Sequence, residues 1–90
     1  MTECEATVEI TNRLGLHLRA ASTLASAVAK FKSAVTLIRG KNRVNARSVT
    51  NLITLGAAKG TRLKVRAEGE DATEAIEAVK MLFQDGFGED

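Results

Sequence analysis

The only histidine of the chain, His17, lies where a glycine-containing loop gives way to a helical pattern, with Gly15 two residues before it and Arg19 two residues after it. The first backbone N–H groups of a helix have no partner inside the helix and attract anions. Arg19 adds a permanent positive charge that suits phosphoryl oxygens, and a neutral imidazole can form a covalent bond through its free nitrogen. The spacing therefore predicts a phosphate site with its own nucleophile, although an ordinary polar residue at a helix start is the simpler interpretation of the spacing alone.

Hydrophobic patterns on both sides of His17 indicate the elements that position it. Apolar and polar residues alternate before the loop, as in a half-buried strand, and from Leu18 apolar residues recur at helical spacing. Ser48 lies where the N-cap of a second helix is expected, and the acidic segment 69–71 leads into a third. The predicted strands cover 4–10, 33–39, 42–46 and 62–67, and the predicted helices cover 18–31, 49–55 and 72–82.

The order β-α-β-β-α-β-α predicts an α+β fold. We expect an open-faced two-layer sandwich in which three helices cover one face of a four-stranded antiparallel sheet. A chain of 90 residues suits one domain, so we expect a single domain over 1–90 with its core in 3–84. Two glycines near the end of the sequence predict a flexible tail over 85–90.

The composition argues against several functional classes. There are 13 Lys and Arg against 11 Asp and Glu, and the net charge of +2 does not require nucleic acid as a partner. The lone Cys4 cannot form an internal disulfide, which is typical of a reducing compartment. No apolar run approaches the roughly 18 residues of a membrane span, and residues 1–15 carry glutamates where a secretory signal carries basic residues. We therefore expect a cytoplasmic monomer without membrane insertion.

Other kinds of site find less support. Arg62, Lys64 and Arg66 share one side of a predicted strand, as in a nucleic-acid-binding α+β module, which stays as an alternative function. Such sheets read bases by aromatic stacking, and no aromatic residue falls on a predicted strand, so we expect no nucleic acid partner. One histidine and one distant cysteine do not furnish a metal site, and Cys4 has the inward parity of a core residue. We expect neither a metal nor a cofactor.

Three motifs taken together resemble the HPr family, the histidine-containing phosphocarriers of the bacterial phosphoenolpyruvate:sugar phosphotransferase system. The segment 15–19 (Gly-Leu-His-Leu-Arg) matches the active-site signature of that family. The segment 47–49 (Arg-Ser-Val) precedes a short helix that ends near Gly56, and the segment 69–71 (Gly-Glu-Asp) precedes the last helix. Each motif is weak alone, but their order and spacing cover 3–84 without a gap and imply an HPr-like sandwich.

The resemblance implies a phosphocarrier that accepts a phosphoryl group from phospho-Enzyme I on Nδ1 of His17 and passes it to an Enzyme IIA-type acceptor. Arg19 and the backbone amides of Leu18, Arg19 and Ala20 would hold the phosphoryl oxygens, because phosphoryl transfer depends on positioning and charge stabilisation. Such a carrier performs no net turnover, so we do not expect an enzyme.

Two positions depart from the family pattern. The family usually has proline after the arginine, where this chain has Ala20; alanine is a strong helix former and restores one N–H donor, so we expect the site to work. Thr50 stands where the family often places a large apolar residue that docks partners. By the resemblance, the docking residues are Leu16, Leu18, Arg47, Val49, Thr50 and Ile53.

The resemblance also leaves two questions of regulation open. In many bacteria the serine that corresponds to Ser48 is phosphorylated by HPr kinase/phosphorylase, and a phosphate there would repel an acidic partner. The regulatory, nitrogen-type (NPr-like) carriers share the His-Arg motif and relay phosphate to control proteins in place of sugar permeases. Ala20 and Thr50 do not decide between the sugar-type and the nitrogen-type branch.

Overall fold

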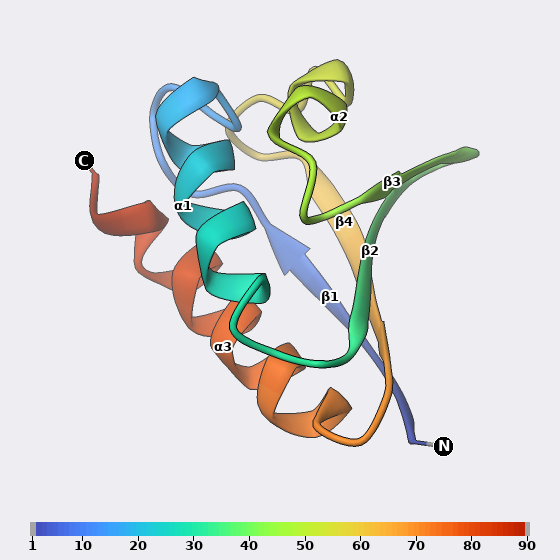
Figure 1. The fold of residues 1–90 in the computed structure, drawn as a ribbon. Coiled ribbons are helices and arrows are strands. Elements are labelled where there is room, and N and C mark those ends of the chain that lie inside the picture. Colours follow the sequence, from blue (N-terminus) through green and yellow to red (C-terminus); the bar gives the residue numbers. More distant parts are fainter. Residues whose placement is uncertain (1, 90) are drawn as a thin grey trace.

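The computed structural model describes residues 2–89 and places the elements in the predicted order. The strands are β1 (Glu3–Glu9), β2 (Ala34–Arg39), β3 (Asn42–Asn45) and β4 (Arg62–Glu68). The helices are α1 (Leu18–Val28), α2 (Val49–Thr54) and α3 (Ala72–Gln84), followed by a short 3₁₀ turn, η1 (Gly86–Gly88). Figure 1 shows the first turn of α1 at the same end of the molecule as the C-terminus.

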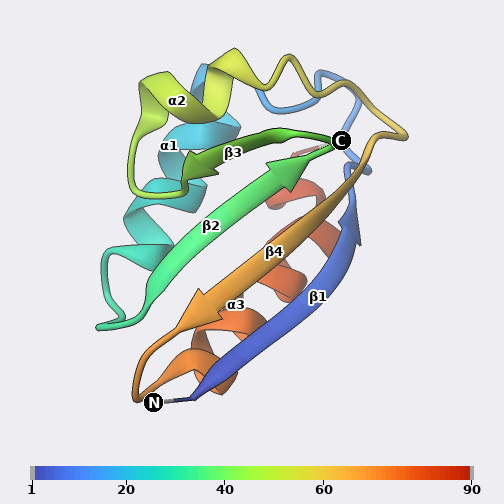
Figure 2. The same cartoon turned by 90° about the vertical axis from the view of Figure 1, so that its right-hand side faces the viewer.

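The four strands form one antiparallel sheet in the order β1-β4-β2-β3. Val65 of β4 pairs with Ala6 of β1 on one side and with Leu37 of β2 on the other, so the apolar parities of three strands share one face. Figure 2 shows the helices behind that face and the other face open. The predicted open-faced α+β sandwich is confirmed.

The core lies between the inner face of the sheet and the helices. Helix α1 buries a stripe of small and branched residues at helical spacing, and α3 does the same from Ala72 to Phe83. Within residues 2–89, none of the helices is both long and apolar enough to span a bilayer. The largest fully buried apolar side chains are Phe83, Ile10, Leu24, Leu37, Leu52, Leu63, Val28, Val65 and Val79.

Helix α1 begins at Leu18 as predicted but ends earlier than predicted. It stops at Val28, and Phe31 lies half-buried in the turn that follows, because residues 29–33 turn the chain into β2. Leu18 is 65% exposed although it continues the apolar stripe. It borders the open depression beside His17, where no further element covers the first turn of the helix.

The C-terminal segment also differs from its prediction. A flexible tail was expected over 85–90, but η1 packs Phe87 into the core, with its ring centroid 4.9 Å from that of Phe83. The two glycines of η1 form the turn that allows this packing, and Glu89 then reaches His17. Residue 90 lies outside the described residues.

The outer face of the sheet explains the basic row on β4. Arg62 is paired in register with Glu9, and Arg66 with Glu5. Arg66 also forms an ion pair with Glu3, while Arg62 Nε lies 3.5 Å from Glu9 Oε1. None of the three phenylalanines lies on a strand of the described residues, so this face lacks the aromatic platform of a nucleic-acid-binding sheet.

Candidate functional site

His17 is the N-cap residue of α1. Its backbone is extended (φ −85°, ψ −176°), its carbonyl accepts the first helical hydrogen bond from Ala21 N at 2.8 Å, and its ring atom Nδ1 accepts a hydrogen bond from Arg19 N at 3.2 Å. An N-cap side chain normally supplies an oxygen for this purpose. Here a ring nitrogen replaces that oxygen as the acceptor, and Nδ1 of His17 therefore points at the start of the helix.

Gly15 lets the loop before His17 fit against the segment after α2. Its φ of +71° is in the left-handed region, and a Cβ atom built on it would lie 2.6 Å from the carbonyl oxygen of Ala57. The next residue, Leu16, donates its backbone N–H to that same oxygen at 3.0 Å and buries its side chain. This turn delivers His17 to the helix start with its ring only partly exposed.

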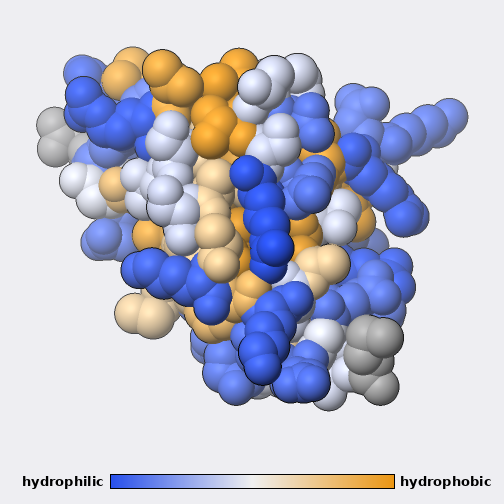
Figure 3. Space-filling view, in the orientation of Figure 1, coloured by the Kyte–Doolittle hydropathy of each residue, from blue (hydrophilic) through white to orange (hydrophobic). Residues whose placement is uncertain are grey.

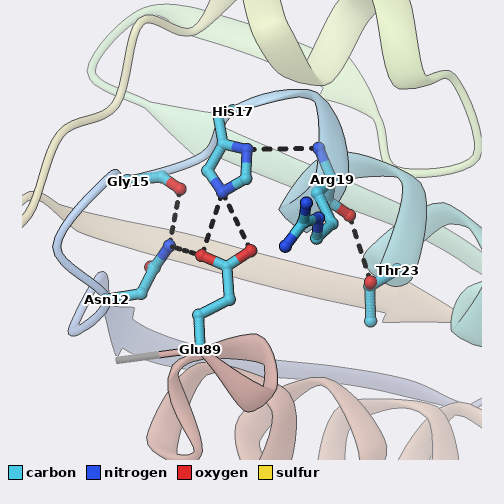
Figure 4. Close-up of polar contacts among 6 residues, drawn as sticks. All are labelled: Asn12, Gly15, His17, Arg19, Thr23 and Glu89. Atoms are coloured by element: carbon cyan, nitrogen blue, oxygen red, sulfur yellow. Dashed lines mark hydrogen bonds and ion pairs between the residues drawn. The ribbon is translucent and has the colours of Figure 1, made fainter.

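The opposite ring nitrogen of His17 is held by Glu89. Nε2 lies 2.9 Å from each of the two carboxylate oxygens of Glu89. Asn12, which is fully buried, donates from Nδ2 to Glu89 Oε1 at 3.0 Å and to the Gly15 carbonyl at 2.7 Å. Figure 4 shows these residues converging from the loop, the start of α1 and the C-terminal segment.

These two contacts determine where the proton lies on the neutral ring. Nδ1 faces an N–H donor, so it must carry the lone pair, and Nε2 faces a carboxylate, so it must carry the proton. The neutral His17 ring therefore has its free lone pair on Nδ1.

Glu89 is an ionised partner in this contact. The hydrogen bond from His17 lowers the pKa of the Glu89 carboxyl, and the amide of Asn12 and the positive charge of Arg19 act in the same direction against partial burial. A carboxylate that stays charged at neutral pH forms a stronger hydrogen bond with the ring N–H than a neutral acceptor does.

An open depression lies directly beside the ring. Its wall is formed by Arg13, Leu14, Leu18 and Arg19 together with His17 and Glu89. Leu14 and Leu18 are each 65% exposed, and Arg13 and Arg19 are also exposed. Figure 3 shows hydrophobic surface over the start of α1 and towards α2, beside hydrophilic side chains. The surroundings of the ring thus combine apolar contact area with positive charge.

The three amides that the family resemblance assigns to phosphate binding lie in the first turn of α1. Leu18, Arg19 and Ala20 are the first three helical residues after the N-cap, and their N–H groups have no acceptor within the helix. The amide of Arg19 is occupied by Nδ1 of His17 in the present state. Ala20 is fully buried, and its methyl group belongs to the core.

The predicted docking residues divide into two groups. Leu18, Thr50 and Ile53 are exposed and Val49 is half-buried, so these four can face a partner. Leu16 cannot, because it is 5% exposed; its assignment as a docking residue is wrong. The Gly15 turn and the backbone hydrogen bond to Ala57 point its side chain into the core.

Arg47, which was predicted to dock partner proteins, forms hydrogen bonds within the protein. Its Nη2 donates to the carbonyl of Phe31 at 2.5 Å and reaches that of Ser33 at 3.4 Å. The side chain is exposed, but its guanidinium is engaged in holding the turn between α1 and β2.

Ser48 is the N-cap of α2, as predicted. Its Oγ accepts a hydrogen bond from Asn51 N at 3.2 Å, and its carbonyl accepts one from Leu52 N at 2.9 Å. The side chain is only half-buried, so the hydroxyl lies near the surface at the start of the helix that carries Val49 and Ile53.

Sequence reasoning missed four contributors to the site: Asn12, Arg13, Leu14 and Glu89. The loop residues stand close to His17 in the sequence, but nothing in their types distinguishes them from ordinary loop residues. The signal for Glu89 was Phe87, an aromatic residue between two glycines, which suggests an anchored turn. Among residues 2–89, no three His, Cys, Asp or Glu side chains group closely enough to hold a metal ion.

The geometry defines a small α+β domain that presents one nucleophilic imidazole nitrogen at a positively charged helix start. The family model described as "PTS HPr component phosphorylation site" matches residues 4–85. The chain therefore belongs to the HPr family of phosphocarrier proteins, and the predicted family is confirmed.

Individual relatives agree with this assignment. The chain is 43% identical to a phosphocarrier protein HPr of Xylella fastidiosa over 100% of this chain and 99% of that one. It is 36% identical to a phosphocarrier protein NPr of Shewanella violacea over 99% and 98% of the two chains. The crystal structure of HPr-C-His from Thermoanaerobacter tengcongensis superposes with a TM-score of 0.92 at 38% identity, covering 97% of this chain and 98% of that one.

Proposed function

We propose that the protein carries a phosphoryl group on Nδ1 of His17 within the phosphotransferase system. The observation that supports this proposal is the tautomer of the ring. Nδ1 has the lone pair at the helix start, and Nε2 has the proton, which it donates to Glu89. In the transfer, the Nδ1 lone pair forms a bond to phosphorus while the bond from phosphorus to the donor's leaving atom breaks, and its electron pair stays with the donor.

The start of α1 receives the charge of the phosphoryl group. When Nδ1 bonds to phosphorus it no longer accepts from Arg19 N, so that N–H becomes free to donate to a phosphoryl oxygen. The Arg19 guanidinium lines the same depression and adds a permanent charge. The oxygens thus meet positive charge from the backbone and from a side chain, while partial exposure of the site leaves the group accessible for onward transfer.

The donor would be phospho-Enzyme I and the acceptor an Enzyme IIA-type protein, in the cytoplasm, with this chain acting as a monomeric carrier without turnover of its own. The surface that supports this proposal consists of exposed Leu14 and Leu18 beside the basic Arg13 and Arg19. Ile53 adds an exposed apolar side chain on α2. Apolar residues with a basic rim suit a partner whose contact surface is apolar and rimmed by acidic groups.

The test is phosphorylation by Enzyme I and phosphoenolpyruvate. Wild-type protein should acquire one acid-labile phosphate, and His17→Ala should acquire none. Arg19→Ala should still be labelled, at a rate lower by roughly tenfold, because a charged donor to the phosphoryl oxygens is lost. Equal labelling of His17→Ala and wild type would overturn the assignment. Nitrogen-15 NMR of the labelled protein should place phosphorus on Nδ1.

A nitrogen-type carrier is the second candidate, supported by the NPr relative that aligns along nearly the whole chain. The rate of phosphorylation by a sugar-type and by a nitrogen-type Enzyme I should be compared under the same conditions. A clear preference for the nitrogen-type donor would assign the chain to that branch.

We propose in addition that Ser48 accepts a regulatory phosphate from an HPr kinase/phosphorylase. Its hydroxyl caps α2 beside Val49 and Ile53, so a phosphate would gain from the helix dipole and add negative charge next to the docking residues. Incubation with ATP and such a kinase should add one phosphate to wild type and none to Ser48→Ala by mass spectrometry. An unmodified wild-type protein would reject this kinase as a partner.

A further inference from the structure

We infer that Glu89 is a positioning residue for phosphoryl transfer, which keeps Nε2 of His17 protonated in the phosphorylated state. This inference rests on the proposed role of His17 as the phosphoryl carrier. It concerns the ease with which the phosphoryl group leaves, and so the rate at which the loaded carrier gives it up.

The contact between Glu89 and His17 is geometrically well defined. Both carboxylate oxygens lie 2.9 Å from Nε2, so the ring N–H points between them. The Glu89 side chain is 15% exposed and that of His17 is 29% exposed, so the carboxylate is better shielded from solvent than the ring that it contacts. Such a contact restricts the rotation of the ring as well as its tautomer.

Two further features hold the carboxylate in place. Asn12 is fully buried and shares its Nδ2 between Glu89 Oε1 and the Gly15 carbonyl; a flipped amide would place an oxygen against both of these oxygens, so its orientation is determined. Phe87, packed against Phe83, anchors the turn two residues before Glu89. The acid is therefore supported from the loop and from the C-terminal segment before any phosphoryl group arrives.

The chemical consequence follows from the charge of the ring. Attack by Nδ1 on phosphorus makes the ring a cation for as long as Nε2 keeps its proton. When the phosphoryl group moves on, the electron pair of the N–P bond returns to Nδ1 and a neutral imidazole leaves. If Nε2 loses its proton first, the leaving group is an imidazolate anion, which is a much poorer one. An ionised carboxylate on Nε2–H stabilises the cationic form.

The phosphoryl group and Glu89 do not compete for one nitrogen, because they occupy opposite sides of the ring. The other charged groups that border the depression are Arg13 and Arg19. Both are cations that disfavour a positive ring, so Glu89 is the one carboxylate among the residues lining this depression that favours it. Its negative charge therefore favours the protonated form of the phosphorylated ring against the two arginines.

The test compares Glu89→Gln with Asp85→Asn, which removes one negative charge from the same segment at an exposed position. Each protein is phosphorylated with Enzyme I and phosphoenolpyruvate, freed of the donor, and followed for spontaneous loss of phosphate between pH 5 and pH 9. We expect Glu89→Gln to lose phosphate about fivefold more slowly than wild type near pH 8 and at an equal rate near pH 5, where the ring is protonated in both. Asp85→Asn should follow wild type.

Nitrogen-15 NMR gives a second readout that a merely structural role would not move. Near pH 8 the Nε2 resonance of phosphorylated Glu89→Gln should report a smaller protonated fraction than wild type, with Glu89→Asp between them. Identical pH profiles and Nε2 resonances in Glu89→Gln and wild type, with both labelled on His17, would overturn the inference while leaving the carrier function intact. Failure of wild type to be labelled on His17 would instead overturn the carrier function itself.

Discussion

Helix α3 has a hydrogen-bonded carboxylate beyond each of its ends, and the two differ in what they hold. At its start, Asp71 accepts from Lys32 N at 2.8 Å, from Ser33 N at 2.9 Å and from Ser33 Oγ at 2.5 Å. Five residues after its end, Glu89 accepts from Asn12 and from the ring of His17. Both carboxylates reach across to a segment beside α1, one at each end of that helix.

The difference lies in the donors. Backbone amides and a buried hydroxyl do not gain or lose charge near neutral pH, so the contact of Asp71 does not depend on the state of its donors and serves the fold. An imidazole can gain a proton or a phosphoryl group, so the strength of the contact of Glu89 depends on the state of the ring. The same type of interaction therefore stabilises structure at one end of the molecule and, under the proposed function, affects phosphoryl transfer at the other.

The largest expected effect is at the Asp71 end. Gly69 has a φ of +148°, and a Cβ atom there would lie 2.7 Å from the backbone Cα of Ser33. Gly69→Ala should lower the free energy of unfolding by about 3 kcal/mol, through strain and the forced separation of the two segments. Urea denaturation measures this loss.

The control for that variant is Gly60→Ala, which has a φ of +91° but open space around the added Cβ. It should cost about 1 kcal/mol from the backbone alone. Gly69 is remote from His17, so Gly69→Ala should change the rate of phosphorylation of His17 by less than about twofold when measured where the variant is fully folded. A larger change would contradict the purely structural role of the Asp71 end.

The next effect concerns the anchor of the Glu89 end. Phe87→Ala removes a buried ring that packs on Phe83, and it should lower the free energy of unfolding by about 2 kcal/mol. It should also slow phosphate loss from His17 near pH 8, as Glu89→Gln does, because the carboxylate is no longer anchored. Met81→Ala, at a 67% exposed position, should change stability by less than about 0.5 kcal/mol.

A smaller effect appears as pH dependence. The hydroxyl of Ser33 and the amides of Lys32 and Ser33 lower the pKa of the Asp71 carboxyl in the folded protein. A lowered pKa contributes stability above the ordinary carboxyl pKa of about 4, and this contribution is lost as pH falls through the folded value. Asp71→Asn should therefore melt several degrees below wild type at pH 7, and the gap should narrow towards pH 3. A constant gap would contradict this assignment.

The smallest effect on stability is expected for Glu89→Gln. The residue lies in the last described segment, and loss of its hydrogen bond with a partly exposed histidine should shift the melting temperature at pH 7 by about 2 °C or less. Calorimetry measures it. If Glu89→Gln lowered the melting temperature more than Asp71→Asn does, Glu89 would be the more important carboxylate for stability, which would contradict the comparison.

The fold was largely predictable because two periods dominate the sequence. Alternation in 62–67 predicts β4, helical spacing after Leu18 and Ala72 predicts α1 and α3, and Ser48 marks the start of α2. The errors lie where packing outside a single element decides. Leu16 was assigned to the surface although Gly15 turns it inward, and Phe31 to α1 although the helix ends before it.

The candidate site was predictable only in its local part. His17 and Arg19 belong to one short segment, and their residue types alone indicate a nucleophile and a phosphate-binding cation. Glu89 stands 72 residues away, and its contact depends on a buried aromatic anchor and a buried amide. No period in the sequence reports a contact of that kind, because it arises from where the finished core leaves the end of the chain.

The N-cap role of His17 has a consequence for how the two forms of the carrier can be told apart. Under the proposed function, the ring nitrogen that accepts from Arg19 N in the free protein is also the atom that would bond to phosphorus, and the incoming oxygens would take over its acceptor role. The helix start exchanges one acceptor for another, so α1 has no reason to unwind or shift. Donor and acceptor proteins must then recognise the loaded carrier by about two added negative charges, not by a new shape.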